Sequence, residues 1–215
     1  MAAREAALPR QTSWAGRLIR NIVLWIVPVW LVWMLLTPLY NRFLVRAAEN
    51  VLLLVESPNV TDLLTQETHT AHIRRRDFPP SRGLVGTVRV TDIHFHLVLL
   101  GALFLAVPGA SWRERLENLG WAALICVFFH LILLFFWVKF VYATQLGNWS
   151  VAHFGPVARN VYGFGKHLLD LPLKLALPFI LWAWFYLGRM MAEMRGDGVP
   201  VSSPLSSKTS ATSSK

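Results

Sequence analysis

The sequence has a single cysteine, Cys126, and lacks the patterns by which many enzymes hold metals or activate nucleophiles. One cysteine excludes an internal disulfide. Its place inside a long apolar stretch favours a small apolar packing residue over a nucleophile, because desolvation disfavours the thiolate. Neither an HExxH pattern nor paired CxxC motifs occur, and no Ser/His/Asp set or carboxylate pair stands out. The chain therefore carries no strong sign of a reaction.

Acidic residues are also missing from the centres of the apolar stretches. A proton relay needs several ionisable groups at similar depth, whereas His130, near the middle of the third stretch, has no Asp or Glu at its level. Paired broken helices in matching halves are missing as well, which disfavours a transporter. We expect His130 to be a neutral imidazole with one interhelical hydrogen bond.

The sequence is rich in long apolar stretches. Hydrophobic residues make up 54% of its 215 residues, and about 20 consecutive apolar residues suffice to cross a bilayer as a helix. The sequence predicts an all-α membrane protein with four transmembrane helices, an interfacial amphipathic helix and a small extramembrane β-hairpin. The predicted spans comprise residues 22–40, 93–108, 119–143 and 171–188, with approximate ends.

The segments before and after the first span are polar or amphipathic. Residues 1–20 form an N-terminal tail, and the uncleaved apolar run that follows reads as a signal anchor. Pro28 predicts a kink and Pro38 a break, because each proline removes a backbone donor. Residues 41–56 then have one broad apolar side. This helix is expected on the membrane surface, with packing against the next extramembrane segment as the alternative.

Within the insert 41–91, two segments predict a β-hairpin around the loop Pro79–Gly83, namely Thr68–Phe78 and Leu84–Thr91. The second alternates apolar and polar residues, as a half-buried strand does. The tetrad Thr61–Leu64 is read as one short helical turn. Two strands are only marginally stable alone, so we expect the hairpin to pack against helices or against a partner.

The second half of the chain is predicted from turn and capping signals. Ser111 and Glu114 match a capping box that opens an unbroken helix over 112–144. Glycines interrupt 145–170, which is read as a polar connection. Residues 196–215 are rich in Ser, Thr and Lys and are expected to be disordered. The four-helix membrane domain thus covers 21–195.

The formal charge of +9 raises nucleic acid as a partner, but Lys and Arg cluster at segment ends, where they reach anionic headgroups. We therefore expect a bilayer and no nucleic acid. With the N-terminus inside, the inner segments hold ten basic residues and the outer segments nine. This margin and the basic N-terminal flank favour a multi-pass protein of the bacterial inner membrane with both termini in the cytoplasm.

Polar side chains in or beside the spans are the best candidates for function, because burying them in lipid is costly. In this topology one group falls at the outer face: Asp92, His94, His96, Lys139, His153, His167, Asp170 and Lys174. Three interpretations stay open. The first is charge pairing, Asp92 with Lys139 and Asp170 with Lys174. The second is a basic pocket for an anionic lipid headgroup or lipid-linked substrate. The third is a metal site of Asp92, His94, His96, His153 and His167.

Four strings resemble small bacterial membrane proteins of the exosortase-associated (accessory) type. They are Leu36–Leu44 (LTPLYNRFL), Val90–Leu97 (VTDIHFHL), Leu103–Gly109 (LFLAVPG) and Tyr142–Pro156 (YATQLGNWSVAHFGP). The resemblance extends over roughly residues 20–188. It implies a bacterial inner membrane and a supporting role in exporting or anchoring surface proteins. The chain does not resemble an exosortase itself, since Cys126 lies too deep and no matching Cys/Arg arrangement occurs.

Two functions follow as hypotheses. The favoured one is a non-enzymatic accessory or scaffold protein of the cell envelope, which contacts another membrane protein or lipids through the insert 41–91 and needs no cofactor. The alternative is a membrane enzyme or binding protein for an anionic lipid-linked substrate at the outer-face polar residues. Catalytic residues are assigned in neither hypothesis.

Overall fold

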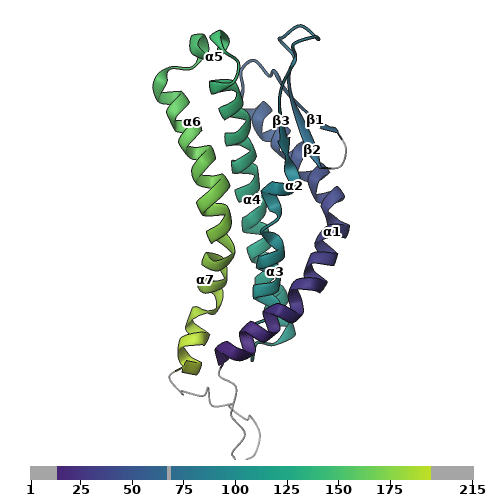
Figure 1. The fold of residues 1–215 in the computed structure, drawn as a ribbon, viewed down its shortest axis with the longest axis vertical. Helices are drawn as coiled ribbons and strands as arrows, with labels where there is room; N and C mark the ends of the chain where they lie inside the picture. Colours follow the sequence, from purple (N-terminus) through teal and green to yellow (C-terminus); the bar gives the residue numbers. More distant parts are fainter. Residues whose placement is uncertain (1–13, 67–68, 195–215) are drawn as a thin grey trace, which may run out of the picture.

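The computed structural model of this chain describes residues 14–66 and 69–194, which form an elongated helical bundle with a small sheet at one end (Figure 1). In this part of the chain three helices are long and apolar enough to cross a membrane. They are α1 (Trp14–Val55), α4 (Trp112–Thr144), and the continuous helix Pro156–Met191. This finding indicates a membrane protein.

The predicted second span is shorter than the other three. It consists of α2 (Val90–His94) and α3 (Leu97–Leu105), separated by Phe95 and His96. Together they form an apolar helix over Val90–Leu105, and 16 residues rise only about 24 Å. Four transmembrane helices are therefore not confirmed, although Val90–Leu105 lies in the bundle with the three long apolar helices (Figure 1).

The predicted break at Pro38 is wrong, because α1 continues through both Pro28 and Pro38. The Thr37 hydroxyl donates a 2.7 Å hydrogen bond to the Trp33 carbonyl, adding a bond where Pro38 removes one. The lower part of α1 packs on α3, and its upper part packs on the sheet. Packing on both sides of the proline holds the two halves in one helix.

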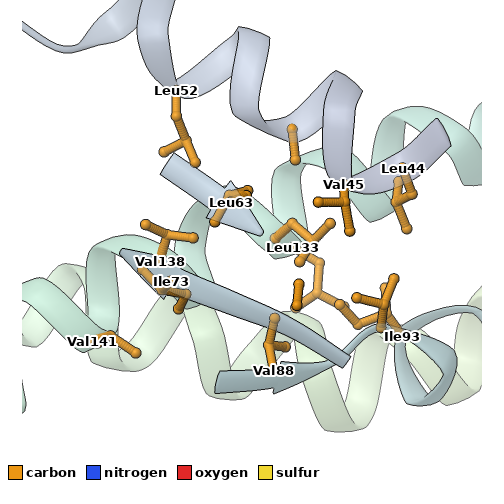
Figure 2. Packing of buried hydrophobic residues seen from close by; sticks show 14 of the residues in the cluster. Leu44, Val45, Leu52, Leu63, Ile73, Val88, Ile93, Leu133, Val138 and Val141 are labelled. Carbon is orange, nitrogen blue, oxygen red and sulfur yellow. The ribbon is translucent and has the colours of Figure 1, made fainter. Parts of the chain in front are cut away.

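The part of α1 that follows Asn41 packs against the sheet, as the alternative prediction has it. Its buried residues Leu44, Val45 and Leu52 pack with strand residues Leu63 and Ile73 in one apolar core (Figure 2). Side chains of α4 complete this core from the other side, among them Leu133, Val138 and Val141.

The extramembrane element is an antiparallel sheet of three strands. It has the order β1 (Thr61–Gln66), β2 (Thr70–Arg75) and β3 (Leu84–Arg89). The predicted hairpin corresponds to β2 and β3, whereas the helical turn predicted over Thr61–Leu64 is a strand that pairs with β2. The sheet has an inner face buried on α1 and α4 and an outer face that carries His72 and Arg74.

The predicted helix 112–144 is confirmed as α4, and Ser111 caps it by accepting a hydrogen bond from the Glu114 amide at 3.2 Å. The polar connection predicted over 145–170 is mostly helical. It contains α5 (Asn148–His153) and α6 (Pro156–Leu168), which leads through a π-helical turn η1 (Leu169–Leu173) into α7 (Lys174–Met194). The predicted tail 196–215 lies outside the described residues, as does most of the tail 1–20, of which 14–20 begin α1.

Exposed apolar side chains on α4 mark the part of this helix that is suited to contact with lipid. On α4 the large ones begin at Trp112 and end at Ile132, a rise of about 30 Å and thus the thickness of a hydrocarbon core. The described residues of α4 beyond Ile132 expose no further large apolar side chain. The sheet packs beside the part of α4 that follows Ile132, against Leu133, Val138 and Val141.

Candidate functional site

Three histidines from two passes meet in the interior of the bundle. His94 ends α2, His96 follows in the turn before α3, and His130 faces them from α4; all three are buried. We call them the histidine cluster. His130 lies two residues before Ile132, so the cluster lies near the end of the exposed apolar run of α4.

Hydrogen bonds from α1 fix the ring of His94. The indole Nε1–H of Trp33, which can only donate, lies 3.1 Å from His94 Nδ1. Nδ1 is therefore an acceptor, and Nε2 carries the hydrogen that His94 donates to Asn41 Oδ1 at 2.6 Å. The amide of Asn41 in turn donates to Thr91 Oγ1 at 3.2 Å. His94 is thus held as a neutral imidazole with both nitrogens used.

His130 makes two hydrogen bonds rather than the one expected. Its Nδ1 lies 2.7 Å from the Tyr40 hydroxyl, and its Nε2 lies 3.3 Å from Nε2 of His96. Because an imidazole nitrogen accepts better than a phenol oxygen, Tyr40 donates to Nδ1, and His130 then donates from Nε2 to His96. The chain of hydrogen bonds ends at His96, whose Nδ1 has no hydrogen-bond partner among the described residues.

A second polar group lies at the π-helical turn η1. Asp170 accepts from Lys174 at 2.7 Å and lies 3.2 Å from Lys166, so two lysines share one carboxylate. Lys166 also lies over the Trp137 ring at 4.1 Å. The predicted Asp170–Lys174 pair is confirmed.

The predicted Asp92–Lys139 pair is wrong. Asp92 is exposed and lies 3.8 Å from Arg89, whereas Lys139 pairs with Glu56 at 2.7 Å. Seven residues, or about 10 Å of helix, separate Lys139 from Ile132, which places this lysine beyond the exposed apolar run of α4.

The sheet is held to α4 and α5 by a second buried cation. The Arg75 guanidinium binds both carboxylate oxygens of Asp77, at 3.0 and 2.7 Å, and lies over the rings of Tyr142 and Trp149 at 4.7 and 4.2 Å. Such planar stacking with a bidentate carboxylate is characteristic of arginine. Arg75 therefore attaches β2 to the end of α4 and to the start of α5.

The remaining predicted site residues lie apart from the histidine cluster. His153 is exposed and stacks on Trp149 at 4.2 Å, and His167 is exposed beside Phe140. Within residues 14–66 and 69–194, no three His, Cys, Asp or Glu side chains are grouped so that they could hold a metal ion. The metal interpretation finds no support in the described structure.

Sequence reasoning missed the α1 residues of this site. Trp33, Tyr40 and Asn41 lie seven and eight residues apart, a spacing that places them on one face of a helix. That polar face within an apolar span was the available signal, and the expected break at Pro38 separated its members.

Comparison with protein-family models, curated proteins and solved structures gave no match to this chain.

Proposed function

We propose that this chain is a non-enzymatic accessory or scaffold protein of the bacterial cell envelope, whose sheet holds a segment of another membrane protein. One observation carries the proposal. The outer face of the sheet has a depression of about 450 Å³, lined by exposed Leu64 and Leu84 and by His72 and Arg74. Exposed apolar side chains beside a cation suit a partner segment that is itself apolar and acidic.

The charge of the sheet region supports an acidic occupant. Residues 61–89 contain five arginines and three acidic residues, a net charge of +2. Three of these arginines are already paired inside the protein, Arg75 with Asp77, Arg76 with Asp62 at 3.5 Å, and Arg89 with Asp92 at 3.8 Å. Arg74 lines the depression on the outer face and is free of the ion pairs that the described residues make.

The rigid attachment of the sheet supports a docking role. Arg75 and the Glu56–Lys139 pair fix the sheet to the bundle, so a partner that binds the sheet is held at a defined place relative to the membrane. The histidine cluster bonds mainly within itself and to α1, which favours a structural use of these imidazoles over catalysis.

The proposal includes the setting that the sequence favours. Four passes then cross the bacterial inner membrane, both termini lie in the cytoplasm, and the sheet faces outward. The resemblance to exosortase-associated proteins adds support for exporting or anchoring surface proteins as the process involved.

Site-directed photocrosslinking in native membranes tests the proposal. A photoreactive residue at His72 should give one discrete product with a membrane protein that copurifies in fixed proportion. Arg74→Glu and Leu84→Asp should each remove both the product and the copurification. Arg82→Glu, an equal charge change on the loop, is the matched control and should leave both intact. Absence of a discrete product at His72, or equal loss with Arg82→Glu, would contradict the docking function.

A further inference from the structure

A cavity of about 370 Å³ lies where α1, the α2–α3 turn and the start of α7 meet. This volume is within the range of small-ligand sites. The cavity has a polar part, lined by Asp92, His96 and Lys174, and the rest of its lining is apolar. Nothing in the docking function of the sheet uses this cavity, so the inference goes beyond that function.

The polar end presents a hydrogen-bond donor without a partner. His96 is only 5% exposed, and its Nε2 is used by His130. Its Nδ1 has no hydrogen-bond partner among the described residues. The direction of the hydrogen bonds from Tyr40 through His130 to His96 Nε2 leaves the hydrogen of His96 on Nδ1. An oxygen acceptor on a ligand would satisfy this donor.

The charges around this end favour an anion. Lys166 and Lys174 share the single carboxylate of Asp170, and Arg89 lies beside Asp92. These three cations and two anions leave a net charge of +1. Lys174 lines the cavity itself and has one described carboxylate partner that it shares, so its ammonium retains donors for a phosphate oxygen.

The apolar end runs down the bundle and opens to its surface. Leu99 is seven residues beyond Asp92, which is about 10 Å deeper along the helix. Ile26, Phe95 and Leu175 line the cavity and are exposed at the bundle surface. A ligand there would have its polar group beside His96 and Lys174 and a hydrocarbon chain along Leu99 and Ile26.

We infer that this cavity binds an anionic phospholipid, with a phosphate oxygen at His96 Nδ1 and Lys174 and an acyl chain along Ile26 and Leu99. Charge complementarity selects an anionic over a zwitterionic headgroup.

Native mass spectrometry of the full-length protein tests this site. The protein is released from detergent after incubation with phosphatidylglycerol or with phosphatidylcholine of the same acyl chains. Phosphatidylglycerol should be retained about fivefold better, the effect of roughly one additional basic contact. Lys174→Gln should reduce this preference to parity. Lys166→Gln is the matched control, because it removes a cation that shares Asp170 but does not line the cavity.

A second variant separates binding from folding. His96→Phe keeps a planar ring but removes the donor, and it should weaken phosphatidylglycerol retention while circular dichroism shows an unchanged helical content. Equal loss with Lys174→Gln and Lys166→Gln, or no headgroup preference in the unaltered protein, would overturn the site. If inorganic phosphate displaces phosphatidylglycerol at equal concentration, the ligand is a free anion and the lipid assignment is wrong.

Discussion

Lys139 of α4 and Glu56, the residue after α1, form an ion pair at 2.7 Å with side chains only 12% and 6% exposed. The carboxylate of Glu56 also accepts from the amide and hydroxyl of Thr61, at 3.1 and 2.7 Å. That hydroxyl lies 2.8 Å from the hydroxyl of Tyr142. One carboxylate therefore joins the end of α1, the first strand and α4.

Removing one partner of this pair should destabilise the protein strongly. Lys139→Gln leaves a buried carboxylate without its cation, which costs about 3–5 kcal/mol of unfolding free energy. Reversible denaturation in detergent measures the loss. Arg89→Gln is the control, because the side chains of Arg89 and Asp92 form an exposed pair, at 73% and 59% exposure respectively. Breaking this pair should change the unfolding free energy by less than about 1 kcal/mol. Similar losses of unfolding free energy in the two variants would contradict this prediction, because the buried pair would then contribute no more than the exposed one.

Close packing of α6 on α4 depends on a glycine. A Cβ added to Gly165 would overlap the ring of Phe136, so Gly165→Ala should push the helices apart and cost about 1–3 kcal/mol. A Cβ at Gly188 meets nothing within 4 Å. The control Gly188→Ala should therefore stabilise α7 by about 0.5–1 kcal/mol through helix propensity. Thermal unfolding followed by circular dichroism compares them, and a stable Gly165→Ala variant would refute the contact.

The bond between Tyr40 and His130 gives a third prediction. Tyr40→Phe leaves His130 Nδ1 buried without a partner, which should cost about 1–3 kcal/mol. Tyr162→Phe is the control, because it retains the ring contacts of Tyr162 with Phe136 and Phe154 and should be close to neutral. Chemical denaturation of both variants gives the difference. A loss of equal size in the two would mean that the hydrogen bond contributes nothing measurable.

The sequence predicted the elements whose signals are local. The capping residue Ser111 and the apolar run after it gave α4, and strand alternation after the loop 79–83 gave the hairpin. Signals that depend on tertiary packing were misread. Pro38 breaks an isolated helix, yet the sheet and α3 hold α1 together on both sides of it.

The candidate site was predicted in part for the same reason. The sequence predicts His94 and His96 among the outer-face polar residues, and it separates His130 from them because His130 lies near the middle of the third span. Its partners come from α1 and from the turn before α3, and sequence distance gives no measure of such neighbours. Glu56 was likewise missed as the partner of Lys139, because the two are 83 positions apart.

Cysteine accessibility in intact spheroplasts tests most directly the claim that the bundle spans the membrane with its sheet outside. In a Cys126→Ala background, Arg82→Cys reports on the sheet loop, Asn148→Cys on α5, and Arg113→Cys on the start of α4. The account predicts that a membrane-impermeant maleimide labels the first two in intact cells and reaches Arg113→Cys only after lysis. Labelling of Arg113→Cys together with Arg82→Cys in intact cells would contradict it.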